Sequence, residues 1–554
     1  MLKQCFKSDA KILWSVFFLI LFLSQPFKFC PAQIIDVGLI EVLSPRGFIR
    51  DSTVVIPMVR AINLGTIQIG CEVFLEIDDA DYSDTVAIFL NPGETFLVTF
   101  RPWTATPPDE YEGEVWIESL PGDTNLLNNE LDFEFVVANP NEFIQGPSLP
   151  PGTNPKKKVK SGGSVVRAFR TGLDQVVDTL IFAFKGNNTR GFFAYDVNKM
   201  NWQVKESIPF APDKAKRVKA GASLCYDGED TIFALKGNNT LEFWAYSVSN
   251  NTWVLKPNVP LGSGKRVKGG AGLAFVTEDG KKYVYCLKGN KTNEFYKFDV
   301  ANNNWMTTIR PAPGGVKGFG SGSCIVYDSI NKRIYALQGT TNQFFYYDVV
   351  GDSWVNRTGM PFDSDILETE NKKAKDGTAM TIDDSVTIYA LKGGTQEFWS
   401  YHIPKDSWFE KDTIPLGLAR KKVKGGGALA FIAQTSGTKG RGEGEIYALK
   451  GNNTDEMWVF LTEAVPPEEK DAKNKTQQSF AGTMAIFNNS SPLPSGKIKV
   501  YDVTGRLIKQ FSPILNQEGV KGKRIGLSNL NTGVYFLRFE SKGFCSIKKL
   551  IVRQ

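Results

Sequence analysis

A lysine recurs at one position ahead of six repeated segments of this chain, usually two residues after another basic residue. The tripeptides read KVK at 158–160, RVK at 217–219, RVK at 266–268, GVK at 315–317, KAK at 373–375 and KVK at 422–424. Ammonium and guanidinium groups gathered on one face attract anions. The pattern predicts an anion-binding site made of Lys160, Lys219, Lys268, Lys317, Lys375, Lys424, Arg217 and Arg266.

Further lysines end the apolar run inside five of the repeats, at Lys185, Lys236, Lys288, Lys392 and Lys450. An acid follows in four of them, at Glu242, Glu294, Glu397 and Glu456. Gln338 and Gln343 replace both partners at once in the fourth copy, and Lys185 is followed by Gly191 instead of an acid. We interpret these lysines as partners of the acids across a hairpin, each exposed pair being worth at most about 1 kcal/mol.

Sites that need several histidines are excluded by composition, because His402 is the only histidine. A Ser-His-Asp triad or a multi-histidine metal site lacks its residues, and we expect no metal, cofactor or catalytic residue. His402 stands where other repeats have Asp196, Asp299 and Asp348, which favours a substitution in a turn. A pair of Asp/Glu carboxylates needs no sequence motif, so an acid–base pair stays open as an alternative.

The repeat itself is an aliphatic and aromatic run, Lys-Gly, a polar loop and a second aromatic run, as in IFALKGNNTLEFWAYSV. Its glycines are 51, 52, 50, 54 and 58 residues apart: Gly186, Gly237, Gly289, Gly339, Gly393 and Gly451. Each copy holds four strand-like segments, a to d, which in the second copy are 222–226, 231–236, 242–248 and 252–256. Such a period predicts a β-propeller of six sheets packed around an axis.

Antiparallel order places the loops before strand a and after strand b on one face of this propeller. Both sets of lysines would then lie on this face. With the five basic residues that stand two positions before the first set, they make sixteen basic groups. Because the whole chain carries a net charge of only +6, the remainder must be net acidic. We therefore expect a polarised molecule with one basic face.

The repeats resemble the kelch repeat in their period, the aromatic residue of strand c and the tryptophan of strand d. These tryptophans are Trp202, Trp253, Trp305, Trp354 and Trp408. Only Gly393-Gly394 keeps the glycine doublet typical of kelch. The resemblance implies a kelch-like six-bladed propeller over residues 139–462 and implies nothing about its ligand.

The sixth copy breaks off after strand c, without a strand-d tryptophan. Residues 141–150 match 251–260 position by position, and Phe143 stands where Trp253 stands. An open propeller leaves an unpaired edge. We therefore expect residues 141–150 to supply the outer strand of the last blade.

Residues 33–138 alternate apolar and polar positions in short segments, which predicts an immunoglobulin-like β-sandwich. The segments AINLGT, LNPGETFLVTF and GDTNLLNNE resemble the adhesion-related CARDB domain. This resemblance implies an extracellular spacer or adhesion module.

Residues 463–480 are polar and charged, which is typical of a linker. Beyond them, YDVTGR, GVYFLR and the terminal KKLIVR resemble the C-terminal sorting domain of the type IX secretion system, over residues 481–554. This resemblance implies a small β-sandwich that engages the secretion machinery.

The N-terminus has three lysines, an apolar run from Ile12 to Leu23 and then Ala32, in the order of a secretory signal peptide. We expect residues 1–32 to be removed, and no later segment could span a membrane. Three of the remaining cysteines, Cys225, Cys286 and Cys324, lie in apolar strand runs, which favours buried thiols over disulfides.

Together these patterns predict an all-β protein that is secreted or displayed on the outer cell surface. The favoured function is binding or adhesion, with a basic face presented to an anionic polysaccharide or a surface protein. Two alternatives stay open: an extracellular carbohydrate-active enzyme with Asp/Glu at the channel mouth, and a structural envelope scaffold. Nucleic acid is not expected as a partner, because the chain carries an export signal.

Overall fold

The computed structural model describes residues 33–463 except 119, 153–155, 172–176, 314 and 434–441, and beyond them only six strands. The expected signal peptide at 1–32 and most of the expected linker at 463–480 lie outside the described residues. Within the described residues every helix is a single 3-10 turn, at η1 (Leu126–Asn128) and η2 (Gly315–Lys317), and the other regular elements are strands. The all-β prediction is therefore confirmed.

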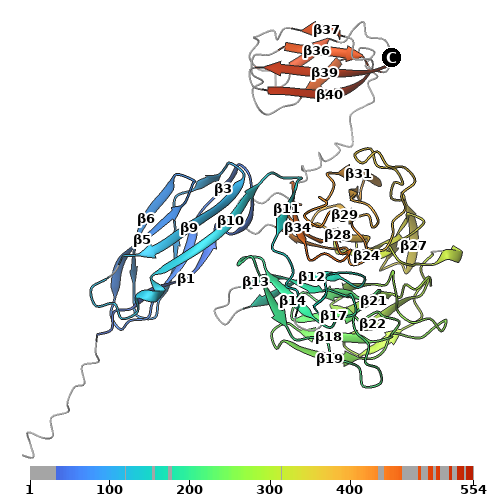
Figure 1. Cartoon of the computed structure of the whole chain (residues 1–554), viewed down its shortest axis with the longest axis horizontal. Coiled ribbons are helices and arrows are strands. Elements are labelled where there is room, and N and C mark those ends of the chain that lie inside the picture. Colours follow the sequence, from blue (N-terminus) through green and yellow to red (C-terminus); the bar gives the residue numbers. More distant parts are fainter. Residues whose placement is uncertain are drawn as a thin grey trace, which may run out of the picture. The chain divides into compact units, whose positions relative to one another are not determined.

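Residues 37–138 form two facing sheets and a short strand pair (Figure 1, blue). The first sheet has the order β1 (Val37–Ser44), β4 (Met58–Asn63) and β7 (Thr95–Thr99). The second has the order β2 (Gly47–Arg50), β10 (Glu130–Ala138), β9 (Asp109–Ile117), β5 (Ile69–Ile77) and β6 (Tyr82–Leu90). The pair is β3 (Thr53–Val55) with β8 (Trp103–Ala105).

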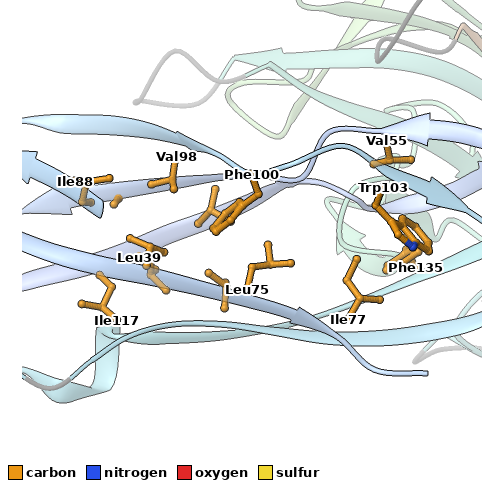
Figure 2. Packing of buried hydrophobic residues seen from close by; sticks show 14 of the residues in the cluster. Leu39, Val55, Leu75, Ile77, Ile88, Val98, Phe100, Trp103, Ile117 and Phe135 are labelled. Carbon is orange, nitrogen blue, oxygen red and sulfur yellow. The ribbon is translucent and has the colours of Figure 1, made fainter. Parts of the chain in front are cut away.

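Alternation along the strands builds the core of this sandwich. In β5, Val73, Leu75 and Ile77 are buried and the residues between them are half-buried or exposed. Figure 2 shows Leu39 and Val98 of the first sheet and Leu75 of the second sheet in the interior between the two sheets. The period-2 pattern of the sequence therefore produces the two-layer packing expected of it.

Six four-stranded antiparallel sheets follow, and each of the first five uses four consecutive strands. The first is β12 (Ser164–Thr171), β13 (Val177–Phe184), β14 (Phe192–Asp196) and β15 (Asn201–Lys205). The second is β16 (Ser223–Tyr226), β17 (Thr231–Leu235), β18 (Phe243–Ser247) and β19 (Thr252–Lys256). The third is β20 (Gly272–Glu278), β21 (Lys281–Leu287), β22 (Phe295–Asp299) and β23 (Asn304–Met306).

The fourth sheet is β24 (Cys324–Asp328), β25 (Arg333–Gln338), β26 (Gln343–Asp348) and β27 (Ser353–Arg357). The fifth is β28 (Ala379–Ile382), β29 (Thr387–Leu391), β30 (Phe398–His402) and β31 (Ser407–Lys411). The sixth is β32 (Ala428–Ala433), β33 (Gly444–Leu449), β34 (Met457–Thr462) and β11 (Phe143–Gly146).

The first strands of the six sheets contact one another in a closed circle. β12 contacts β16, and the contacts continue through β20, β24, β28 and β32 back to β12. The strands are therefore arranged around one axis as in a β-propeller (Figure 1, green to orange). We call the sheets blades 1 to 6 in the order given.

Blade 6 takes its outer strand from the chain that precedes blade 1. β11 pairs antiparallel with β34, with Phe143 opposite Phe460. In blade 2 the equivalent partners are Trp253 and Tyr246. This is the pairing that the comparison of repeats predicts, and it joins the two ends of the propeller.

The strand-d tryptophans lock neighbouring blades together. The indole of Trp253 donates a hydrogen bond to the backbone oxygen of Glu206 in the loop that follows the preceding blade, and Trp408 bonds Thr358 in the same way. The ring of Trp253 also packs on Phe184 and Phe192 of blade 1. The repeated tryptophan is thus an interblade contact, which explains its place in the repeat.

The C-terminal unit is described by its strands alone. One sheet has the order β37 (Leu507–Phe511), β36 (Lys497–Asp502), β39 (Gly533–Ser541) and β40 (Phe544–Val552). A separate pair joins β35 (Met484–Phe487) with β38 (Lys523–Gly526). The YDVTGR and GVYFLR segments thus contribute neighbouring strands, β36 and β39.

Candidate anion-binding face

The loop before strand a ends in the same four-residue turn in every blade. The backbone oxygen of its first residue accepts a hydrogen bond from the fourth, as Lys160 does from Gly163. The third residue is always a glycine with φ between +88° and +99°: Gly162, Gly221, Gly270, Gly322, Gly377 and Gly426. A positive φ at this place requires glycine. The first residue of each turn is called the ring position below.

These glycines also pack each blade against the next. A Cβ on Gly162 would lie 2.3 Å from the backbone oxygen of Lys219, and one on Gly377 would lie 2.0 Å from that of Lys424. The same approach closes the circle between Gly426 and Lys160, at 2.4 Å. The ring position of each blade is therefore held by its neighbour.

Five of the six ring positions are lysines, and the sixth is a glycine. They are Lys160, Lys219, Lys268, Gly320, Lys375 and Lys424. Lys317, the expected sixth member, lies three residues earlier in η2 and is exposed. The tripeptide alignment was wrong for that copy, because Lys317 lies three residues before the ring position, which Gly320 occupies. The turn signature Lys-x-Gly, which blade 4 lacks, could have revealed this.

The polar loops after strand b fix the backbone of the lysine loops. The side chain of Asn238 donates to the backbone oxygen of Arg217, and Asn290 donates to Arg266 in the same way. On the other side, Thr189 of blade 1 forms a backbone bridge with Val218. The asparagines of these loops thus hold the basic loops in place, a role that their turn-forming tendency alone does not reveal.

The side chains at the predicted positions remain free of acids. All six predicted lysines and Arg217 are exposed, and Arg266 is half-buried. Over residues 33–463 with the gaps given above, none of these eight residues forms an ion pair. Val159, Val218, Val267 and Val423, each just before a ring lysine, are buried. The loop is thus anchored by the apolar residue and presents the lysine to solvent.

The lysines that end strand b have a different role. Four are paired with the predicted acids: Lys236 with Glu242, Lys288 with Glu294, Lys392 with Glu397, and Lys450 with Glu456. The predicted pairing is confirmed. The pairs are far more buried than expected, with both side chains of Lys392 and Glu397 at 0% exposure and 2.6 Å apart. Burial lowers the pKa of Lys392, while Glu397 acts in the opposite direction through its hydrogen bond and charge.

Each of these lysines also holds the loop before strand a. The ammonium group of Lys236 donates to the backbone oxygen of Pro209, and that of Lys450 donates to Pro415. Trp244 and Trp458 lie beside the same ammonium groups, and their indoles donate to the paired glutamates. The strand-b lysines are therefore structural, and eleven of the sixteen basic groups remain for the surface.

The axial cavity opens between the turns and the first strands. It has a volume of about 150 Å³ and is lined by residues from all six blades, mostly glycine, alanine and serine. Asp376 is the one carboxylate among its described lining residues, and its oxygen accepts a hydrogen bond from Ser161 at 2.8 Å. A pair of acids placed for hydrolysis is absent from this lining.

His402 acts as a turn cap. Its Nδ1 atom lies 3.3 Å from the backbone nitrogen of Lys405, which donates to it. Asp196, at the same place in blade 1, accepts a hydrogen bond from the backbone nitrogen of Lys199, which also lies three residues later in the sequence. The interpretation of His402 as a turn substitution is therefore confirmed.

The thiols of Cys225 and Cys286 are buried and free, and that of Cys324 is half-buried and free. Burial raises the pKa of Cys286 and Cys324 to about 12. Among the described residues, no group of three or more His, Cys, Asp or Glu side chains could hold a metal ion.

Comparisons with solved structures return chains of low identity. A protein of unknown function from Bacteroides thetaiotaomicron is 14% identical, with a TM-score of 0.39, over 78% of this chain and 99% of its own. An auxiliary nutrient binding protein from the same organism is 10% identical, with a TM-score of 0.38, over 77% of this chain and 98% of its own. The CARDB domain of a Pyrococcus furiosus protein is 24% identical, with a TM-score of 0.17, over 19% of this chain and 96% of its own. No curated protein matches the chain.

The C-terminus matches a known domain family. Residues 481–553 match the secretion system C-terminal sorting domain. Among the described residues, no helix has the length and apolar character needed to cross a membrane. The sorting domain indicates secretion and attachment at the outer cell surface through the type IX system, so this chain is an exported all-β protein.

Proposed function

We propose that the propeller binds an anionic glycan, or an acidic surface protein, through the face that carries the ring lysines. The supporting observation is that five exposed lysines, which form no ion pair with another described residue, occupy one repeated backbone position around a single axis. The turn glycines and the asparagine side chains of the loops after strand b hold the backbones of these lysines. Binding therefore costs little backbone conformational entropy. A ring of like charge around an axis concentrates anions.

The geometry of the axial cavity favours binding over hydrolysis. An acid–base mechanism needs two carboxylates in reach of one bond. The described lining holds Asp376 alone, and Ser161 already donates to it. The N-terminal sandwich would serve as a CARDB-like spacer or adhesion module, and the propeller would be kelch-like.

The test is a glycan array probed with the full-length chain and with a variant that carries Lys160→Glu, Lys219→Glu, Lys268→Glu and Lys424→Glu. We expect the chain to bind acidic glycans and the variant to lose that binding. The matched control changes the charge equally on the opposite face, with Lys199→Glu, Lys281→Glu, Lys332→Glu and Lys405→Glu, all four being exposed. Thermal unfolding of both variants checks that they fold. Equal binding by wild type and ring variant would reject the proposal.

A further inference from the structure

We infer that Lys291 supplies the sixth cation of the ring, in place of the lysine that blade 4 lacks, and that it forms with Lys265 a subsite for one acidic sugar unit. The inference rests on the proposed function and deepens it. Lys291 lies in the loop after strand b of blade 3, next to the turn of blade 4. Sequence comparison does not reveal it, because the substitute comes from a different loop.

The first observation is where the Lys291 side chain lies. Gly320 occupies the ring position of blade 4, because its backbone oxygen accepts a hydrogen bond from the backbone nitrogen of Ser323. A Cβ on Gly270 of blade 3 would lie 2.0 Å from the same oxygen, a close approach that the other blades share. A Cβ on Gly320 itself would lie 3.2 Å from Cγ of Lys291. The aliphatic stem of Lys291 therefore passes over the place where the sister blades begin their lysine side chain.

The second observation is the backbone of Lys291. Its φ is +60°, in the left-handed region, and the equivalent residues of three sister loops are Asn188, Asn239 and Asn453 at φ of +60° to +64°. Asparagine tolerates this region well, whereas lysine is disfavoured there. Lysine thus occurs at a strained position in the one loop that neighbours a glycine at the ring position. Strained backbone conformations of this kind cluster at functional sites.

The third observation is a hollow beside Lys291. It has a volume of about 390 Å³ and is lined by Ser263, Lys265, Lys291, Thr292, Asn293, Glu294 and Pro311. Lys265 and Lys291 both line this hollow, and the Lys265 ammonium group donates to the backbone oxygen of Lys291 at 3.4 Å. The charge of Glu294 is matched by the buried Lys288 at 3.0 Å, and neither Lys265 nor Lys291 forms an ion pair with another described residue.

The hollow also carries groups suited to a sugar. The side-chain oxygen of Asn293 is buried and has no hydrogen-bond partner among the described residues, although the amide nitrogen of the same side chain donates to Gly315. A buried acceptor of this kind is satisfied by a hydroxyl donor. Pro311 adds an apolar surface beside it. Two cations, a free acceptor and an apolar wall together fit a sugar that bears a carboxylate or a sulfate group.

The experiment measures the affinity of the full-length chain for dextran sulfate, polygalacturonate and neutral dextran. Lys291→Asn installs the residue of the sister loops, so the fold should be kept. We expect it to weaken binding of the preferred polyanion about fivefold, the effect of one lost ion pair of about 1 kcal/mol. Lys291→Asn with Gly320→Lys should restore the affinity, because it returns the cation to the ring position. Lys332→Asn, which removes an exposed lysine with a φ of +53° from the opposite face, should bind as wild type.

The possible results separate failure of this inference from failure of the proposed function. Weaker binding by Lys291→Asn, rescue by Gly320→Lys and no effect of Lys332→Asn support the inference. Equal affinity of wild type and Lys291→Asn overturns it while leaving the proposed function standing. Absence of binding by the wild type to either polyanion rejects both. Comparison of the two polyanions decides between a sulfate and a carboxylate as the recognised group, and equal binding of neutral dextran overturns recognition of charge.

Discussion

The ammonium nitrogen of Lys185 lies 2.9 Å from Oδ1 of Asp455, so a buried ion pair joins blade 1 to blade 6. Lys185 is the strand-b lysine that has no acid in its own hairpin, and it is 2% exposed. Its partner comes from the loop after strand b of the preceding blade. The two ends of the propeller are thus linked by a charge pair as well as by the pairing of β11 with β34.

Asp455→Asn should lower the free energy of unfolding by about 3 kcal/mol, because it leaves the Lys185 ammonium group buried without a counter-charge. Urea denaturation at neutral pH measures the change. Asp412→Asn removes an equal charge from an exposed position and serves as the control. A similar stability for both variants would show that Lys185 finds another partner or solvent.

The pair of Lys392 with Glu397 permits a double-mutant cycle that follows a natural precedent. Blade 4 has Gln338 opposite Gln343 at the same place. Lys392→Gln and Glu397→Gln should each cost about 3 kcal/mol, since each leaves one buried group without its ion pair. The double variant should be clearly more stable than the sum of the two losses predicts. Additive losses would mean that the two side chains are not energetically coupled.

Gly377→Ala should destabilise the propeller far more than Gly228→Ala. Both glycines have positive φ, +99° and +84°. A Cβ on Gly377 would lie 2.0 Å from the backbone oxygen of Lys424, whereas one on Gly228 meets nothing within 4 Å. Gly228→Ala should therefore cost only the backbone term, about 1 kcal/mol, and Gly377→Ala about 3 kcal/mol or more. Thermal unfolding distinguishes the two, and equal losses would contradict the crowding.

Phe143→Ala tests the closure of the propeller. The Phe143 ring lies 5.0 Å from the rings of both Phe398 and Phe460, between blades 5 and 6. Its removal should cost about 2–3 kcal/mol, the range for a large residue at a partly buried aromatic contact. Val254→Ala is the control, because Val254 is an exposed residue of the equivalent outer strand. An unchanged melting temperature for Phe143→Ala would mean that β11 adds little to the fold.

Glu445 should make stability depend on pH near neutrality. Burial raises its pKa to about 7, while the Tyr447 hydroxyl, which donates to it, acts in the opposite direction. The folded protein therefore holds this proton more tightly than the unfolded chain does. Stability should fall as pH rises from about 4.5, the ordinary pKa, to about 7, and no further loss should follow.

Denaturation at several pH values compares wild type with Glu445→Gln. The free energy of unfolding of the variant should not show this decrease. The stability of the variant relative to wild type should therefore increase as the pH rises from about 4.5 to about 7. Glu370→Gln, at an exposed position, should run parallel to wild type. Parallel curves for Glu445→Gln and wild type would contradict the raised pKa.

Much of the architecture could be predicted from the sequence because its signals are local. The strand segments of blade 2 agree with β16 to β19 to within a residue or two, since alternation and turn residues act over a few positions. The match of Phe143 to Trp253 gave the outer strand of blade 6, because a repeat lacking a segment must find it elsewhere in the chain. The four hairpin ion pairs could be predicted for the same reason, since their partners are five or six residues apart.

The tertiary structure alone decided which lysines stand together. The tripeptide GVK aligns Lys317 with the ring, but Gly320 occupies that position and Lys291 lies beside it. Lys185 was left without an acid, yet Asp455 reaches it from 270 residues away. The sequence by itself determined an all-β repeat protein with a secretion tail, because periodicity and motifs are local. Which cations are buried and which face solvent depends on how blades meet, and contacts between distant segments leave no mark in the spacing of one repeat.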